Sequence, residues 1–307
     1  MTGERHDAPA GLISQRDFAT VAELLKRMAG IHLNPNKRAM VSGRLNKRLK
    51  ATGQKTISAY CDALQGPDHT DEQDAFISAL TTNMTRFNRE AHHFTHLTES
   101  VLPALLETVR GGGRARLWSA GCSTGEEAYD LAFHVLRACP DAARLDIRIL
   151  ATDIDKSVLM TAQAGLYSVA DLSHLTDKHA ERFFDRRIAP VGMASICEAA
   201  RELIAFRRLN LDSDWPFHGK FDVIMCRNVA IYFDDATQIR LWHRLTDRLQ
   251  AGGALYIGHS EALPEAVTGR VRHEGAGVFR LAPVSSAARS LARQRTKTTE
   301  KADELER

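Results

Sequence analysis

A glycine-containing loop followed by two glutamates is the segment of this 307-residue sequence whose residue types best suit ligand binding. Gly121 and Gly125 let the backbone turn sharply and approach a ligand closely. The residues from Glu126 onward have helical spacing, and a helix start presents N–H groups without partners inside the helix. A second apolar run, 147–153, ends in an acid at the position where doubly wound proteins bind ribose hydroxyls. Together these segments predict a site for a nucleotide-like ligand.

The charge of this loop indicates which ligand it binds. Dinucleotide sites normally carry GxGxxG, which brings bare backbone amides to a pyrophosphate. Here the loop has Ser123, Glu126 and Glu127, and two carboxylates would repel a diphosphate. They suit a cofactor with an amino group and a sulfonium, so the loop favours S-adenosylmethionine over NAD. From the loop alone an alternative stays open, in which the acids only complement the helix dipole and Thr124 is the cap.

Composition predicts a cytoplasmic protein with one large and one smaller domain. No apolar run reaches membrane-spanning length, and the first residues lack the basic-then-apolar order of a signal peptide. The five cysteines are scattered and form no CxxC pair, which argues against a disulfide framework or a zinc site.

The stretch from Leu24 to Cys61 contains nine Lys or Arg residues and no Asp or Glu. An Asn-Pro start at 34–35 and a Thr-Gly stop at 52–53 predict one helix that carries most of this charge. Its apolar stripe leaves Lys37, Arg44, Lys47 and Arg48 on another face, which we expect to bind an acidic protein or a nucleic acid, with Arg44, Lys47 and Arg48 as substrate contacts. A merely solvated helix is the alternative.

Residue patterns divide the chain into a flexible start (1–15), a helical domain with linker (16–110), an α/β domain (111–283) and a disordered tail (284–307). Strands are predicted at 116–119, 147–152, 203–210, 221–226 and 254–258, and helices at 126–138, 156–164 and 236–249. This alternation is typical of a parallel sheet covered on both faces. The segments 270–274 and 278–281 predict a hairpin that adds an antiparallel last strand.

Five segments in order along the chain resemble the chemotaxis receptor methyltransferases called CheR. They are TTNMTRFNREAHHF at 81–94, SAGCSTGEEAY at 119–129, ATDID at 151–155, CRNVAIYFD at 226–234 and GHSE at 258–261. The resemblance implies a Rossmann-like methyltransferase sheet, a small N-terminal helical domain and a small β insertion, which we expect near 190–206. Ala128 and Asn88 depart from the family pattern, and neither is an expected cofactor contact.

The resemblance also implies site residues. Glu126 would accept a hydrogen bond from the cofactor's amino group, and Asp153 would bind its ribose. Arg89 and Tyr232 would orient the substrate carboxylate. The full set of expected cofactor contacts is Asn83, Thr85, Arg89, Ala120, Glu126, Asp153, Asn210, Leu211, Asn228 and Val229.

The expected reaction is methyl transfer from S-adenosylmethionine to receptor glutamates, which gives glutamate methyl esters and S-adenosylhomocysteine. A glutamate carboxylate is already an anion at neutral pH, so the reaction needs alignment and removal of water more than a base. No metal or nucleophile constellation is evident, and adjacent His92 and His93 point in different directions on a helix, so we interpret them as packing groups.

The expected partners are the cytoplasmic helices of chemoreceptors, and the protein is expected to be a monomer without membrane insertion. Contact of the β insertion with a receptor C-terminal peptide is left open. Two further hypotheses remain: a nucleic-acid methyltransferase that uses the basic helix on phosphates, and a non-catalytic module that binds S-adenosylmethionine to regulate a partner.

Overall fold

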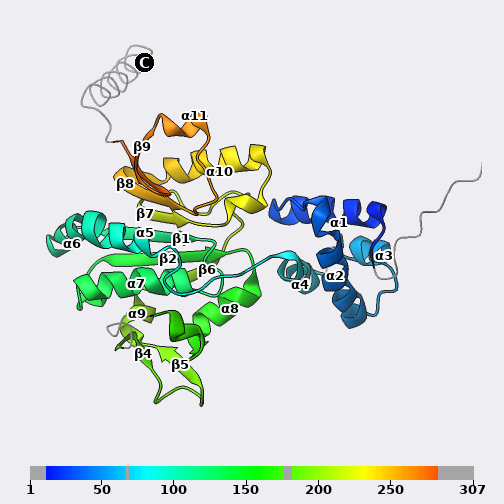
Figure 1. Cartoon of the computed structure of the whole chain (residues 1–307), viewed down its shortest axis with the longest axis horizontal. Coiled ribbons are helices and arrows are strands. Elements are labelled where there is room, and N and C mark those ends of the chain that lie inside the picture. Colours follow the sequence, from blue (N-terminus) through cyan, green and yellow to red (C-terminus); the bar gives the residue numbers. More distant parts are fainter. Residues whose placement is uncertain (1–11, 67–68, 176–181, 283–307) are drawn as a thin grey trace, which may run out of the picture.

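The structure is a computed structural model that describes residues 12–66, 69–175 and 182–282. A helical domain lies at one end of an elongated molecule, and an α/β domain forms the rest (Figure 1). The described part of the first domain consists of α1 (Gln15–Ala29), the 3-10 turn η1 (Pro35–Lys37), α2 (Arg38–Thr52), α3 (Ile57–Ala63) and α4 (Thr70–Leu80). This confirms the all-helical domain that the spacing predicted.

Side-chain caps and glycines in the left-handed region set several helix ends of this domain. The Ser14 side chain accepts a hydrogen bond from the Asp17 N–H at the start of α1, and Gly30 ends that helix in the left-handed region at φ 74°. Asn34 caps η1 in the same way, and Gly53 ends α2 at φ 72°. The predicted stop of the basic helix is therefore confirmed, whereas the predicted Asn-Pro start opens the 3-10 turn η1 and α2 itself begins at Arg38.

The basic face of α2 is not free, however. The Arg44 Nη1 atom donates a hydrogen bond of 2.6 Å to the carbonyl oxygen of Thr81, just after α4. The Arg48 Nε atom donates one of 3.0 Å to the Glu72 carboxylate, and this contact raises the pKa of Arg48. Lys47 alone of the three predicted partner-binding residues is exposed. Both arginines thus have partners within the helical domain, because α4 and the residue after it supply carbonyl oxygens to Arg44 and an acid from outside the acid-free stretch to Arg48.

One continuous helical segment leads from the linker into the α/β domain. It consists of α5 (Ala91–His96), the π-helical turn η2 (Leu97–Val101) and α6 (Leu102–Arg110). Pro103 has no N–H to donate to the preceding turn, which explains why the regular hydrogen-bond ladder widens there. Turn residues 111–114 then lead into the first strand, as expected from the glycines.

Seven strands form a mixed sheet in the order β6, β2, β1, β7, β8, β10, β9. The first five strands are parallel, and β10 pairs antiparallel with both β8 and β9. The antiparallel closing strand predicted from the hairpin is confirmed. The strands are β1 (Ala115–Ala120), β2 (Ile147–Asp153), β6 (Ile204–Arg208), β7 (Phe221–Cys226), β8 (Leu249–Ile257), β9 (Val271–Gly275) and β10 (Val278–Leu281).

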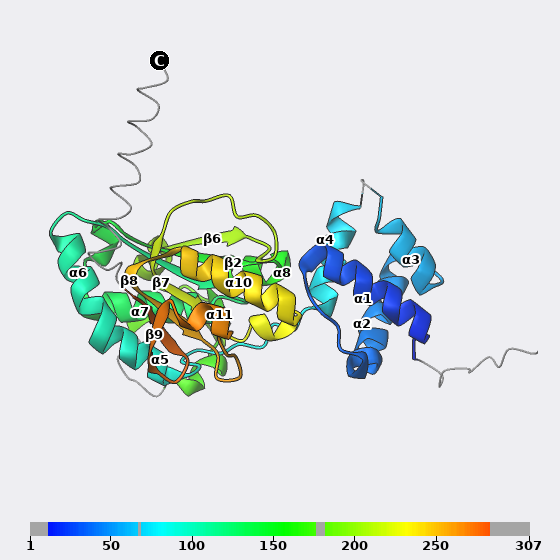
Figure 2. The same cartoon turned by 90° about the horizontal axis from the view of Figure 1, so that it is seen from above.

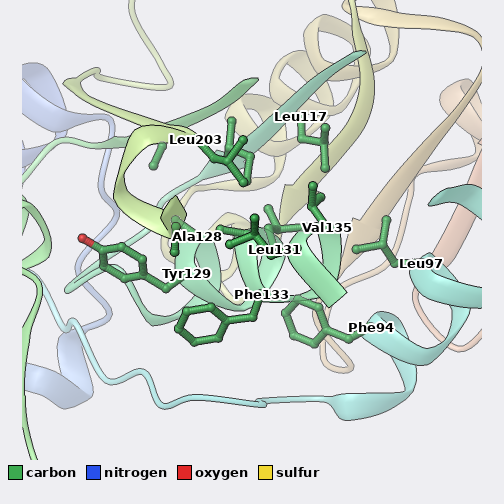
Figure 3. Packing of buried hydrophobic residues seen from close by; sticks show 14 of the residues in the cluster. Phe94, Leu97, Leu117, Ala128, Tyr129, Leu131, Phe133, Val135 and Leu203 are labelled. Carbon is green, nitrogen blue, oxygen red and sulfur yellow. The ribbon is translucent and has the colours of Figure 1, made fainter. Parts of the chain in front are cut away.

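Helices cover both faces of this sheet, with α10 (Asp235–Asp247) and α11 (Glu265–Thr268) on one face. On the other lie α7 (Glu126–Ala138), α8 (Lys156–Ala164) and α9 (Glu198–Glu202), with the 3-10 turn η3 (Ala142–Arg144) nearby (Figure 1). Neighbouring strand residues face opposite layers. Leu117 belongs to the apolar core around α7, whereas Trp118 belongs to the core that α10 shares with the helical domain. Figure 3 shows side chains of α7, including Leu131 and Phe133, in the first of these cores.

A second, three-stranded sheet has the order β3 (Leu166–Ser168), β5 (Met193–Ile196), β4 (Phe184–Asp185), with the 3-10 turn η4 (Asp171–His174) after β3. Its pairings are antiparallel. The predicted β insertion therefore exists, but it begins earlier in the chain than 190. Residues 204–206 belong to β6 instead, because they pair with β2 in the main sheet.

The predicted flexible start covers residues 1–15, of which 1–11 lie outside the described residues, and the predicted tail, 284–307, lies wholly outside them. None of the described helices has the length and apolar character needed to cross a lipid bilayer.

We predict that Arg48→Glu destabilises the helical domain by about 2 kcal/mol, because it places a carboxylate against the partly buried Glu72. Lys47→Glu adds the same charge one residue away at an exposed position and should change the free energy of unfolding by less than about 0.5 kcal/mol. Urea unfolding of both variants measures the difference. Equal effects would contradict a structural role for the Arg48–Glu72 pair.

Candidate active site

A cavity of about 330 Å³ lies where the parallel strands end, next to the helical domain. The strand ends β1, β2, β6 and β7 contribute to it, and so does the linker that precedes α5. Figure 2 shows the helical domain beside this end of the sheet. The cavity is lined by residues from the segments 29–37, 80–89, 121–123, 153–154, 209–211 and 227–233, together with Glu127 and Asp130.

The loop after β1 is fixed by backbone contacts on both sides. The N–H groups of Gly121 and Cys122 donate to the carbonyl oxygen of Thr152, at 2.8 and 2.9 Å. Gly121 has φ 87°, and a side chain there would overlap the Val229 side chain from the β7 loop. The Ser123 hydroxyl donates to the Asn83 carbonyl oxygen at 2.8 Å. The loop after β1 thus contacts both the linker, through Asn83, and the loop after β7, through Val229.

Asp153, at the end of β2, accepts backbone hydrogen bonds through both carboxylate oxygens. The Ser123 N–H donates to Oδ2 at 2.8 Å and the Asp155 N–H donates to Oδ1 at 2.9 Å. Burial nevertheless raises the pKa of Asp153, because the charged form loses its water. The carboxylate lines the cavity, where the sequence placed it.

The acids of α7 differ from the prediction in which of them face the cavity. Glu126 is outside the cavity lining, and its Oε2 atom accepts a hydrogen bond from the Thr124 hydroxyl at 2.7 Å. Glu127 and Asp130 line the cavity instead. They are three residues apart and share a helix face, whereas Glu126 is rotated about 100° from its neighbour. The rotation of α7 about its own axis relative to the sheet decides which acids face the cavity, and the sequence did not reveal this rotation.

Burial raises the pKa values of both α7 acids that line the cavity. The pKa of Asp130 rises to about 8, and its Oδ2 atom accepts a hydrogen bond from the Asn88 N–H at 2.7 Å. Burial also raises the pKa of Glu127, although Arg227 and Ser119 oppose the shift. A cationic ligand beside these acids would favour their charged forms.

Arg227 is a buried cavity residue that the sequence reasoning missed. Its Nε atom lies 3.0 Å from the Glu127 carboxylate, and its Nη2 atom donates to the Arg89 carbonyl oxygen at 2.6 Å. It therefore joins α7, β7 and the linker under the cavity. The sequence signal was its place directly before Asn228 in a motif that the resemblance had already marked.

Of the adjacent histidines only His93 is a packing group, since His92 is exposed, and the expectation that they point in different directions is wrong because both contact one carbonyl oxygen. His93 is fully buried, and its Nε2 atom lies 2.9 Å from the carbonyl oxygen of Ala276 in the β9–β10 turn. A carbonyl oxygen can only accept, so we assign the proton to Nε2. Burial and nearby Arg227 lower the pKa of His93 to about 4. His92 contacts the same carbonyl oxygen at 3.1 Å.

Glu261, from the GHSE motif, holds the loop after β7. Its Oε1 atom accepts the N–H groups of Val229 and Ala230 at 2.9 and 2.8 Å. Its Oε2 atom accepts those of Asn228 and Gly258 at 2.8 and 2.6 Å. Successive N–H groups that converge on one anion form a backbone nest. The carboxylate thereby supports Asn228 in the left-handed region, at φ 59°.

Two residues expected to orient a carboxylate line the same cavity. The Arg89 Nη1 atom donates to the Met84 carbonyl oxygen at 2.9 Å, and the Tyr232 hydroxyl donates to the Thr82 carbonyl oxygen at 3.2 Å. Lys37 of the helical domain lies over the Tyr232 ring, with Nζ 5.4 Å from the ring centre. The structure thus brings Arg89 and Tyr232 to one cavity, and Lys37 adds a second cationic group beside them.

Most of the predicted cofactor contacts line the cavity, and the predicted contacts on the basic helix do not. Eight of the ten expected cofactor residues line the cavity: Asn83, Thr85, Arg89, Asp153, Asn210, Leu211, Asn228 and Val229. Ala120 and Glu126 do not line it, although both are buried directly beside the loop. The basic-helix residues Arg44, Lys47 and Arg48 are also outside the lining, whereas Lys37 belongs to it.

The cavity separates charges in a way that limits what it can bind. Three acids that line it are buried: Glu127, Asp130 and Asp153. The buried Arg227 lies beside Glu127, whereas the other Lys and Arg side chains of the lining keep access to solvent: Lys37, Arg86 and Arg89. Within the described residues, the buried Oδ1 atom of Asn228 has no hydrogen-bond partner, as expected of an acceptor that a ligand satisfies. The arrangement suits a cationic ligand inside and a carboxylate outside.

Comparison with known proteins supplies independent evidence. A family model described as the CheR methyltransferase SAM-binding domain matches residues 83–278, and one described as the CheR methyltransferase all-alpha domain matches residues 16–81. A probable chemotaxis protein methyltransferase of Rhizobium etli is 43% identical over 246 residues, which cover 80% of this chain and 90% of the relative. The chemotaxis protein methyltransferase of Escherichia coli is 38% identical over 251 residues, 81% of this chain and 85% of the relative.

We predict that Glu261→Gln destabilises the protein by about 3 kcal/mol. Each carboxylate oxygen accepts two N–H groups, so an amide nitrogen at either position faces two donors. Glu265→Gln is the matched control, because Glu265 is exposed in the first turn of α11. Denaturant unfolding measures both variants. A Glu261→Gln variant as stable as the control would show that the loop after β7 does not depend on this carboxylate.

Proposed function

The chain belongs to the CheR methyltransferase family, and from this we propose which of its residues hold the cofactor and which orient the substrate. The protein is an S-adenosylmethionine-dependent protein-glutamate O-methyltransferase of chemotaxis receptors. The family match sets aside the nucleic-acid and non-catalytic alternatives. In addition, two of the three basic residues considered for a nucleic-acid surface have partners within the protein.

We propose that the inner part of the cavity binds S-adenosylmethionine. When bound, this cofactor supplies a methyl group that is activated by a sulfonium charge. Glu127 and Asp130 are the acids that would pair with its amino group, in place of the predicted Glu126. Asp153 would accept hydrogen bonds from its ribose hydroxyls, and Gly121 lets the backbone approach closely. The three buried acids support this placement because a cation offsets the cost of burying their charge.

The remaining predicted residues would complete the cofactor site. Asn210 and Leu211 lie at one side, where the Asn210 amide donates to the Met28 carbonyl oxygen at 3.2 Å and is thereby oriented. Asn228 offers its unpartnered Oδ1 atom, and Val229 packs beside Gly121. We propose that Leu211 contacts the apolar face of the adenine, since its side chain is buried and lines the cavity.

The outer part of the cavity would receive the receptor glutamate. The Arg89 guanidinium can bind a carboxylate through paired hydrogen bonds, and the Tyr232 hydroxyl can donate another. A glutamate is ionised at neutral pH, so these groups need only orient it and exclude water rather than remove a proton. The two positions lie on different chain segments that the Tyr232–Thr82 hydrogen bond joins.

Basic residues of α2 that have no role inside the helical domain are candidates for contact with the receptor. Lys47 is exposed on α2, so we propose it as a contact for an acidic receptor helix, whereas Arg44 and Arg48 act within the helical domain. In the described part of the small sheet β4 is an edge strand, and we propose that a receptor C-terminal peptide extends the sheet there. A monomeric state of the enzyme stays a prediction.

The direct test is methyl transfer to a chemoreceptor cytoplasmic fragment with methyl-labelled S-adenosylmethionine. We expect base-labile label on glutamates. Tyr232→Phe should lower kcat about tenfold, equivalent to about 1.4 kcal/mol, and leave the Kd for S-adenosylhomocysteine within about twofold. Trp215→Phe serves as a control for aromatic replacement outside the cavity lining. Label that resists base, or none on receptors, would contradict the proposed reaction.

The raised pKa of Asp130 predicts a pH dependence of cofactor binding. With a pKa of about 8, Asp130 carries a proton at neutral pH in the free protein. A bound cation favours the charged carboxylate, so binding should release protons, and affinity should rise with pH until it levels off above about 8. Asp130→Asn retains an acceptor for the Asn88 N–H and should abolish this dependence.

Isothermal titration with S-adenosylhomocysteine, which has the same amino group, measures proton release in buffers of different ionisation enthalpy. Equal proton release by the unaltered protein and by Asp130→Asn would assign the titration to another group.

A further inference from the structure

Two large apolar side chains lie exposed at the cavity. Among the described residues, the exposed large hydrophobic side chains are Met84, Met160, Ile188, Val191, Ile231 and Ile239. Of these, Met84 and Ile231 line the cavity, and they are 83% and 45% exposed. An exposed apolar side chain at a binding cavity gains free energy when a bound partner covers it, which makes both residues candidates for contact with a partner.

The backbone holds both side chains in position. The Arg89 guanidinium donates to the Met84 carbonyl oxygen at 2.9 Å. Ile231 lies in the 3-10 turn η6 (Ala230–Tyr232), whose first N–H group is bound by the Glu261 carboxylate. The Tyr232–Thr82 hydrogen bond then joins the two segments. Met84 and Ile231 are therefore exposed on anchored segments that meet at the cavity wall.

The charges nearby indicate what kind of partner they contact. Lys37, Arg86 and Arg89 line the same cavity, and all retain access to solvent. A partner that satisfies both features presents a carboxylate and an apolar side chain close together. On a helix, residues three or four positions apart are neighbours on one face. An amphipathic helix with a glutamate one turn from an apolar residue fits this combination.

We propose that Met84 and Ile231 bind an apolar side chain one helical turn from the target glutamate and thereby select which receptor glutamates are methylated. This inference rests on the proposed function, because it assigns the substrate helix of the same site. The cationic groups attract any exposed carboxylate, so charge alone distinguishes poorly among the many glutamates of an acidic helix. Contact with a neighbouring apolar side chain supplies the missing discrimination.

The test compares polar variants of similar size with matched controls. Met84→Gln and Ile231→Thr should each lower kcat/KM for a receptor fragment about tenfold, since burial of such a side chain contributes on the order of this factor. The Kd for S-adenosylhomocysteine should stay within about twofold. Met160→Gln and Ile239→Thr make the same replacements at exposed residues of α8 and α10 that do not line the cavity. They should leave kcat/KM and the Kd for S-adenosylhomocysteine unchanged.

A second measurement locates the contact on the substrate. The apolar residue one turn from the target glutamate is changed to serine in the receptor fragment, and a double-mutant cycle is run with Met84→Gln. Coupling is expected, so that the double change costs less than the sum of the single changes.

Each outcome has a separate meaning. Methylation by the variants at the rate of the controls, while the unaltered protein labels receptor glutamates, would overturn the inference and leave the proposed function intact. Parallel loss of cofactor affinity would also overturn it, by placing Met84 or Ile231 in the cofactor site. If the unaltered protein transfers no methyl group to receptor glutamates, the proposed function and the inference both fail.

Discussion

Four backbone N–H groups that converge on the Glu261 carboxylate hold the loop on which the rest of the site depends. A chain that leaves a buried strand end must find partners for its N–H groups, and here one side chain satisfies them. The same loop then places Arg227 beneath the cavity and Val229 against Gly121. The walls contributed by β1, β7 and the linker therefore depend on one half-buried anion.

The loop also connects the α/β domain to the helical domain. The His32 N–H donates to the Tyr232 carbonyl oxygen at 2.8 Å, and Ile31 forms a β-bridge with Phe233. Lys26 pairs with Asp234 at 2.6 Å in an ion pair that is largely exposed and therefore contributes little stability by itself. Because Tyr232 lies between these contacts, the domain that closes the cavity also fixes the residue proposed to orient the substrate.

The charged groups that line the cavity suit the two reactants of the methyl transfer. Methyl transfer from a sulfonium to a carboxylate brings a cation and an anion together, and both must lose water before they react. The lining of the proposed site combines the buried acids Glu127, Asp130 and Asp153 with the partly exposed Lys37 and Arg89. Preorganised charges of this kind act without further rearrangement when the reactants meet. The cavity needs no additional base, since its substrate is already ionised.

The sequence by itself determined the alternation of strands and helices, the antiparallel end of the sheet and the identity of the cofactor loop, because periodicity, glycines and caps act over a few residues. Eight of the ten residues that the sequence marked as cofactor contacts line the cavity, since strand ends carry the motif residues. Only the tertiary structure decided that Glu127 rather than Glu126 faces the cavity, and that Arg48 pairs with Glu72. Helix rotation against a sheet and contacts between distant helices arise from packing of the whole chain, which no local pattern encodes.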